Sequence, residues 1–100
     1  MASTIAGEHA PRRYRGALRR RRVHYSVPET LLEDTQRSCE RIRTQVEHYA
    51  WHKIDHNLHV TVSLGVAHNL GHARPEDQIR EADARLYVAK QSGKNRVIAN

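Results

Sequence analysis

Three histidines recur at every fourth position, His48, His52 and His56. On one continuous helix this spacing would line three imidazoles along a single face, where they could bind zinc or nickel. Residues 53–57, however, are typical of a loop that leads into a strand, and no carboxylate or thiol lies at ligand spacing. We therefore expect no metal site at these histidines.

The single cysteine, Cys39, lies on the apolar stripe of a predicted helix, which favours a buried structural thiol over a nucleophile. One cysteine excludes an internal disulfide and is typical of a reducing compartment. The chain has no run of about 18 apolar residues that could cross a bilayer and no apolar signal-peptide core at its start. These features predict a protein of the cytoplasm, with at most one small domain in 100 residues.

The positive charge is concentrated in one block. Residues 11–23, PRRYRGALRRRRV, hold seven arginines and no acid, and they account for the formal net charge of +6. A block of like charge without an apolar period is normally disordered. We predict a basic, disordered arm over residues 1–27 and a folded body over residues 28–100. Within the arm, the segment VHYS is the one place where a strand is expected, by pairing with residues 58–67.

The body shows four patterned segments, which indicate an α+β fold of two helices packed on a small mixed or antiparallel sheet. A capping box at Thr30 and Glu33 opens a helix over residues 30–49. Strict alternation predicts a strand over residues 58–67, with one fully apolar face. A second helix is expected over residues 75–91, and a short strand over 95–98. The predicted apolar stripes are Leu32, Cys39, Ile42, Val46 and Tyr49 in the first helix and Ile79, Ala82, Leu86 and Ala89 in the second.

The motifs VTVSLGVA (residues 60–67) and EADARLYVAKQSGKNRV (residues 81–97) resemble the closing segment of the GGDEF domain of diguanylate cyclases. In that family a strand VTxSxGVA precedes a helix ADxALYxAKxxGRNRV. The resemblance runs from about residue 27 to residue 97, less than half of a complete GGDEF domain. It implies a truncated domain of the nucleotidyl-cyclase type.

The resemblance also implies a reaction. Two such domains each hold one GTP, and each 3′-hydroxyl attacks the other α-phosphate to form cyclic di-GMP with magnesium as cofactor. Lys90 and Lys94 match the family's two basic residues that contact the phosphates, although the second is usually arginine, which offers a bidentate fork that lysine lacks. The alternative for both lysines is a solvated helix end favoured by the helix dipole. Asp83 matches a structural position of the family, and we assign it no catalytic role.

The other parts that this chemistry requires are absent from the sequence. The family's first strand with its metal-binding aspartate and the helices that hold guanine have no counterpart, and no Gly-Gly-Asp-Glu-Phe occurs. We therefore expect no catalytic residue and no metal ligand in this chain, no bound cofactor, and no activity of the chain alone. The family's partners would be GTP and either a second copy or a complete GGDEF domain.

The arginine run invites a hypothesis about reading frame. With one choice of codons for ALRRRRVHYS (residues 17–26), reading one nucleotide later gives Arg-Tyr-Gly-Gly-Asp-Glu-Phe-Thr-Ile-Leu, a credible GGDEF hairpin. On this hypothesis the arm is a shifted frame that returns to the original one near Val27. The alternative to a shifted frame is a basic arm that binds nucleic acid, whose affinity would fall steeply with salt. The alternative function is an interaction module that docks through the basic arm, an unpaired sheet edge or exposed helix faces.

Overall fold

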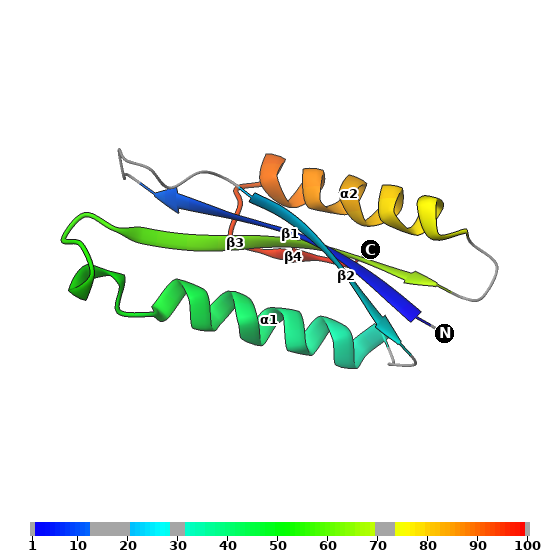
Figure 1. Ribbon diagram of the computed structural model, residues 1–100, viewed down its shortest axis with the longest axis horizontal. Coiled ribbons are helices and arrows are strands. Elements are labelled where there is room, and N and C mark those ends of the chain that lie inside the picture. Colours follow the sequence, from blue (N-terminus) through cyan, green and yellow to red (C-terminus); the bar gives the residue numbers. More distant parts are fainter. Residues whose placement is uncertain (1, 13–20, 29–31, 70–73, 100) are drawn as a thin grey trace.

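The protein folds as a four-stranded mixed sheet with one helix on each face (Figure 1), in a computed structural model that describes residues 2–12, 21–28, 32–69 and 74–99. The sheet order is β2-β1-β3-β4, with β1 antiparallel to both neighbours and β3 parallel to β4. The strands are β1 (Ala2–Arg12), β2 (Arg21–Pro28), β3 (His59–Asn69) and β4 (Val97–Ile98). The helices are α1 (Leu32–His48), the short 3-10 helix η1 (Trp51–Lys53) and α2 (Pro75–Gln91). This architecture confirms the predicted α+β class.

Strand β3 supplies core residues to both helices. Leu64 and Val66 pack with Cys39 of α1, while Ala67 packs with Leu86 of α2. Successive residues of a strand point to opposite faces, so neighbouring positions of β3 serve different helices. The predicted strand is confirmed, and its face of small side chains is buried as well as its apolar face.

Helix α2 has the predicted bounds, with Pro75 at its first turn. Three residues of its predicted stripe are fully buried, namely Ala82, Leu86 and Ala89. The prediction is wrong at Ile79, which is 41% exposed, whereas its neighbour Gln78 is 3% exposed. The first turn of α2 therefore presents an amide, not an aliphatic side chain, to the sheet.

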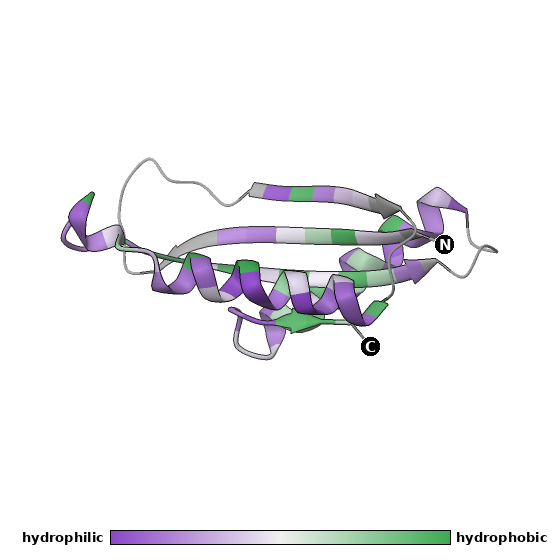
Figure 2. Cartoon of the chain, turned by 90° about the horizontal axis from the view of Figure 1, so that it is seen from below, coloured by the Kyte–Doolittle hydropathy of each residue, from purple (hydrophilic) through white to green (hydrophobic). Residues whose placement is uncertain are grey.

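Helix α1 lies within the predicted range 30–49, and Thr30 of the predicted capping box lies outside the described residues. Its predicted stripe is buried at Cys39, but Ile42 and Tyr49 are exposed. Seen from the α1 side, α1 lies over β3 while β1 and β2 extend beyond it (Figure 2). Ile42 lies on the part of the α1 surface that does not contact the sheet, and Tyr49 follows the last residue of the helix.

The prediction of an arm without structure is wrong for residues 2–12 and 21–27. Strands β1 and β2 form an antiparallel hairpin, and β1 also pairs with β3 along its whole length. The like charges begin only at Arg12, so the repulsion argument did not apply to β1. Pairing on both sides satisfies the backbone of β1, and Ser3 and Ala6 are fully buried. The segment VHYS does form a strand, but its partner is β1, not β3.

Candidate functional site

The C-terminal end of α2 carries the two lysines expected to contact phosphates. Lys90 lies in the last turn of the helix, and Lys94 lies in the tight turn that follows. Lys94 and Asn95 have φ angles of 62° and 50°, in the left-handed region, and Gly93 has a φ of 125°. The Lys94 N–H donates to the Ala89 carbonyl at 2.9 Å, which closes the helix. This turn sends the chain back into β4 and fixes the backbone from which the Lys94 side chain extends.

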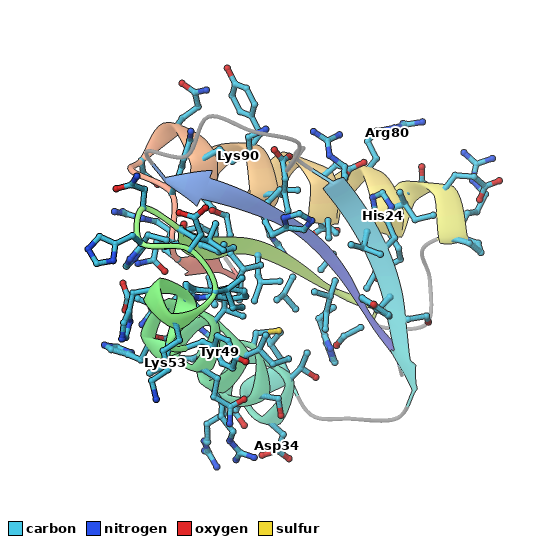
Figure 3. The ribbon with its side chains drawn as sticks, turned by 60° about the vertical axis from the view of Figure 1, so that its left-hand side comes forward. His24, Asp34, Tyr49, Lys53, Arg80 and Lys90 are labelled. Atoms are coloured by element: carbon cyan, nitrogen blue, oxygen red, sulfur yellow. The ribbon has the colours of Figure 1, made fainter. Side chains whose placement is uncertain are left out.

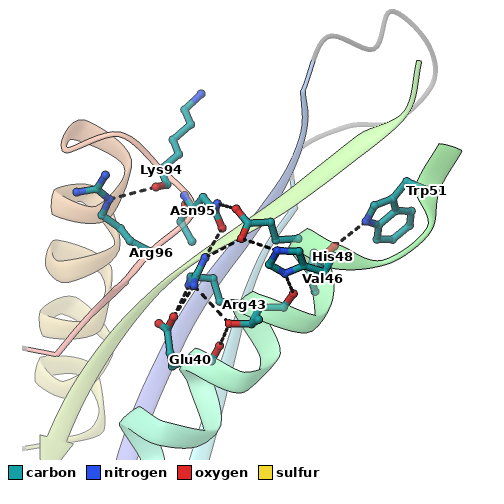
Figure 4. Close-up of polar contacts among 11 residues, drawn as sticks. Glu40, Arg43, Val46, His48, Trp51, Lys94, Asn95 and Arg96 are labelled. Atoms are coloured by element: carbon teal, nitrogen blue, oxygen red, sulfur yellow. Dashed lines mark hydrogen bonds and ion pairs between the residues drawn. The ribbon is translucent and has the colours of Figure 1, made fainter. Parts of the chain in front are cut away.

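The left-handed backbone is held by Asn95. Its N–H donates to Ser63 Oγ at 3.0 Å, and its side-chain amide donates to the Glu47 carboxylate and accepts from the Arg43 guanidinium at 3.0 Å (Figure 4). Non-glycine residues with positive φ are uncommon and persist where the surroundings hold them. One asparagine therefore ties the turn after α2 to β3 and to α1.

Charge reinforces this network. The hydrogen bond from Asn95, and then the Arg43 guanidinium, hold the pKa of Glu47 below its ordinary value. The hydrogen bond to Glu40 is the main cause that raises the pKa of Arg43. Arg43 is 17% exposed, so its ion pairs are better shielded from solvent than those of an open surface arginine. In Figure 4 the Lys94 ammonium extends away from this network.

Lys90 meets a carboxylate from β1. Its Nζ donates to Glu8 Oε2 at 3.0 Å, and Glu8 is 8% exposed while Lys90 is 23% exposed. The guanidinium of Arg22, from β2, lies 3.8 Å from the same oxygen. Figure 3 shows Lys90 of α2 and His24 of β2 along the side of the sheet that α2 covers. The structure therefore places Lys90 in a cluster of two cations and one buried carboxylate.

A second polar contact joins β2 to α2. His24 Nε2 lies 2.8 Å from Asp83 Oδ1. Beside this contact lies an open cavity of about 290 Å³, to which the buried Gln78 contributes a side-chain oxygen that has no hydrogen-bond partner among the residues that the structure describes. The cavity is lined by Thr4, His24, Tyr25, Ser26, Pro75, Gln78 and Ile79.

The three histidines of the four-residue repeat lie in three different elements. His48 ends α1, His52 lies in η1 and His56 lies in the turn before β3, and all three are exposed. They share no helix face because α1 ends at His48. Within the described ranges, no three His, Cys, Asp or Glu side chains gather closely enough to hold a metal ion. Burial raises the pKa of the Cys39 thiol to about 11, as expected for a core residue.

Several side chains of this site were missed from the sequence. Glu8 and Arg22 lie in the segment predicted to be disordered, so no pattern pointed to them. Glu47 and Arg43 look like ordinary surface charges of an amphipathic helix. Asn95 lies within the motif that ends the second helix, and its place in that motif was the one available signal of a structural role.

The sequence matches a known protein family. A family model described as "Diguanylate cyclase, GGDEF domain" matches residues 23–96, about three quarters of the chain. The chain belongs to the GGDEF family. It is 34% identical over 102 residues to the response regulator PleD of Caulobacter vibrioides, which covers 98% of this chain and 21% of that protein. It is 38% identical over 72 residues to the diguanylate cyclase DosC of Escherichia coli K12, which covers 71% of this chain and 16% of that protein.

Solved structures of the family confirm the fold. The coiled coil and GGDEF domain of DgcB from Caulobacter crescentus, in complex with c-di-GMP, superposes with a TM-score of 0.75 at 20% identity and covers 99% of this chain and 70% of that one. This chain spans about a fifth or less of the length of the curated relatives named above. No helix in the ranges described here combines the length and the apolar character that a membrane span needs.

Proposed function

We propose that residues 28–100 are the closing part of a diguanylate cyclase domain, that Lys90 and Lys94 derive from its triphosphate site, and that this chain alone does not form cyclic di-GMP. The observation that carries the proposal is the position of both lysines at one end of α2, with Lys94 on a turn that Asn95 anchors. Cations held at fixed positions are what a triphosphate requires. GTP is the nucleotide proposed for this site.

The family implies magnesium, and the residues here do not fit it. Magnesium takes oxygen ligands, usually carboxylates together with substrate phosphates. The buried carboxylate nearest Lys90 is Glu8, and its Oε2 is already hydrogen-bonded to Lys90 and close to Arg22. A divalent cation at that oxygen would face two positive charges. Among the described residues, this carboxylate therefore does not fit magnesium, and for this reason we expect no turnover by the chain alone.

We propose that residues 1–27 replace the family's hairpin segment through a shifted reading frame. The match to the family model begins at Val23, directly after the arginine run, whereas the similarity to PleD covers 98% of the chain and so extends into the segment before it. The nucleotide sequence of the gene over codons 10 to 27 tests this. Codons that read Gly-Gly-Asp-Glu-Phe one nucleotide later support the proposal, and codons that cannot do so refute it.

The protein partner we propose is a second copy or a complete GGDEF domain, in the cytoplasm. Strand β2 is one of the two outer strands of the described sheet, and its described side chains, residues 22–26, are exposed. An outer strand presents backbone groups that another strand can pair with, which supports docking at this edge.

Activity and binding can be tested separately. The purified chain, incubated with GTP and magnesium, should give no cyclic di-GMP by chromatography above a control without protein. Binding of GTP, measured by calorimetry at low ionic strength, should weaken about tenfold in Lys90→Ala and in Lys94→Ala. Lys53→Ala removes the same charge from η1 and serves as the control, with no change expected. Clear turnover, or equal GTP binding by all variants, would refute the proposal.

A further inference from the structure

Glu8 is a buried carboxylate whose charge must be compensated. It lies on β1 two residues after Ala6, so both side chains face α2. An ionised carboxylate taken out of water is costly unless it is paired and hydrogen-bonded. Lys90 at 3.0 Å and Arg22 at 3.8 Å provide this compensation, and both approach Oε2.

Two cations that converge on one oxygen form the arrangement with which proteins hold a phosphate oxygen. The Arg22 side chain is 50% exposed, so solvent reaches the cluster from the side of β2. Lys90 is the better shielded cation, at 23% exposure. The Glu8 carboxylate thus contacts a shielded cation, Lys90, and a more exposed cation, Arg22. Solvent reaches the cluster on the Arg22 side.

The fold fixes these positions without help from a ligand. The register of the hairpin sets Glu8 directly opposite Arg22, and cross-strand neighbours on one face lie close together. Two residues further along β2, His24 bonds to Asp83 and ties the strand to α2. Arg22 is therefore held beside α2, within reach of the same oxygen as Lys90.

We propose that Arg22 and Lys90 form a binding site for a phosphate-type oxyanion, and that Glu8 occupies this site in the free chain. The inference rests on the phosphate role proposed for Lys90 and adds two residues to it, the second cation Arg22 and the occupant Glu8. The carboxylate and an incoming phosphate oxygen compete for the same donors. The chain as it stands should bind phosphates weakly, and removal of the Glu8 charge should open the site.

The test is Glu8→Gln with inorganic pyrophosphate as the probe, measured by calorimetry at low ionic strength. We expect pyrophosphate to bind at least about tenfold more tightly than to the original chain, because a charge-assisted competitor is gone. Adding Arg22→Gln or Lys90→Gln to this variant should abolish the gain. The control is Glu33→Gln, which removes an equal charge from the exposed first turn of α1 and should leave affinity unchanged.

Two outcomes overturn the proposal: equal affinity of Glu8→Gln and the original chain, or an equal gain in Glu33→Gln. If Glu8→Gln does not fold by circular dichroism, Arg22→Gln in the original chain replaces it. That variant should weaken pyrophosphate binding at least about threefold, while Arg37→Gln, an exposed arginine of α1, should not. An Arg22→Gln chain that binds as well as Arg37→Gln also refutes the proposal.

A parallel titration with GTP identifies the source of the phosphate. If Glu8→Gln raises the affinity for GTP and for pyrophosphate equally, the result supports a nucleotide's phosphate chain as the ligand. If it raises the affinity for pyrophosphate alone, the result supports free phosphates. The same data separate the two proposals. If Lys90→Gln weakens GTP binding but Glu8→Gln has no effect, the phosphate role of Lys90 survives and the competition by Glu8 does not. If Lys90→Gln has no effect, the proposed function itself fails.

Discussion

Replacing Gly65 by alanine should destabilise the protein strongly, because β3 and α2 meet there without space for a side chain. A Cβ at this position would lie closer than 3.0 Å to backbone atoms of Ala82, Arg85 and Leu86. Ordinary contacts of a Cβ begin near 3.4 Å, and the obstacle is helix backbone, which cannot rotate away. The helix must therefore shift as a body.

The size of the effect follows from this shift. Overpacking costs about 1–3 kcal/mol, and a gap of about 0.5–1 Å between α2 and the sheet forfeits a quarter to a half of the dispersion energy there. We expect the free energy of unfolding to fall by about 3 kcal/mol or more, which lowers the melting temperature of a chain this size by more than about 10 °C. Without the close approach, alanine in a strand would instead raise the free energy of unfolding by about 0.4–1 kcal/mol, because it restricts the unfolded chain. The sign of the change in stability therefore distinguishes the two cases.

Urea unfolding followed by far-ultraviolet circular dichroism measures the change, and Gly7→Ala is the matched control. The Cβ of that variant would meet the tip of Leu64 at 2.8 Å, and a side-chain tip can turn aside. Gly7→Ala should change stability by less than about 1 kcal/mol. Equal stability of Gly65→Ala and the original chain, or equal losses in both variants, would show that α2 does not approach β3 as closely as described.

Three further experiments test the interior and the α1 network. Thr35→Val should raise the free energy of unfolding by about 1 kcal/mol, because the buried Thr35 hydroxyl has no hydrogen-bond partner among the described residues. Thr44→Val, which removes a bonded hydroxyl, should not raise it; a loss of stability in Thr35→Val contradicts this. Cys39 should react with a thiol reagent far more slowly near pH 8 than in urea, since burial raises its pKa to about 11; equal rates would show that the thiol is open. The pKa of Glu47 in the folded chain lies below its unfolded value of 4.5. Its contribution to the free energy of unfolding is therefore present above pH 4.5 and is lost as pH falls through the folded pKa. Asn95→Ala removes the main cause of this shift, and its urea midpoint should therefore depend less on pH below about pH 5 than that of the original chain; an unchanged dependence contradicts the link.

The body of the fold could be predicted from the sequence because its apolar residues recur at clear strand and helix spacings. The alternation in residues 58–67 and the Pro75 start of α2 predicted elements of the right kind, but these patterns left open whether the sheet is mixed or antiparallel. Exposure of Ile42 and Ile79 could not be predicted, because the apolar period says which face is buried but not how far the neighbouring sheet extends beneath it.

The arm and the site were harder for a different reason. Charge repulsion acts between residues that lie close together, but the prediction of disorder also covered residues 2–10. These residues contain no basic residue apart from His9. What orders β1 is pairing with β3, which lies far along the chain and leaves no local pattern. Glu8 and Arg22 therefore could not be placed, and the lysines were found only through the resemblance to a family.

The central position of β1 has a consequence for how the chain reaches its native state. Its pairing with β3 joins residues 47 to 67 positions apart, from Arg12↔His59 to Ala2↔Asn69. Contacts this distant require large loops to close before they contribute, so folding should be slow compared with that of helical domains. Until β3 docks, β1 has only the β2 hairpin, and an isolated two-stranded hairpin is marginally stable. The strand that holds the Glu8 carboxylate should thus be among the last parts to become protected, and its open edge is where association between incompletely folded chains would begin.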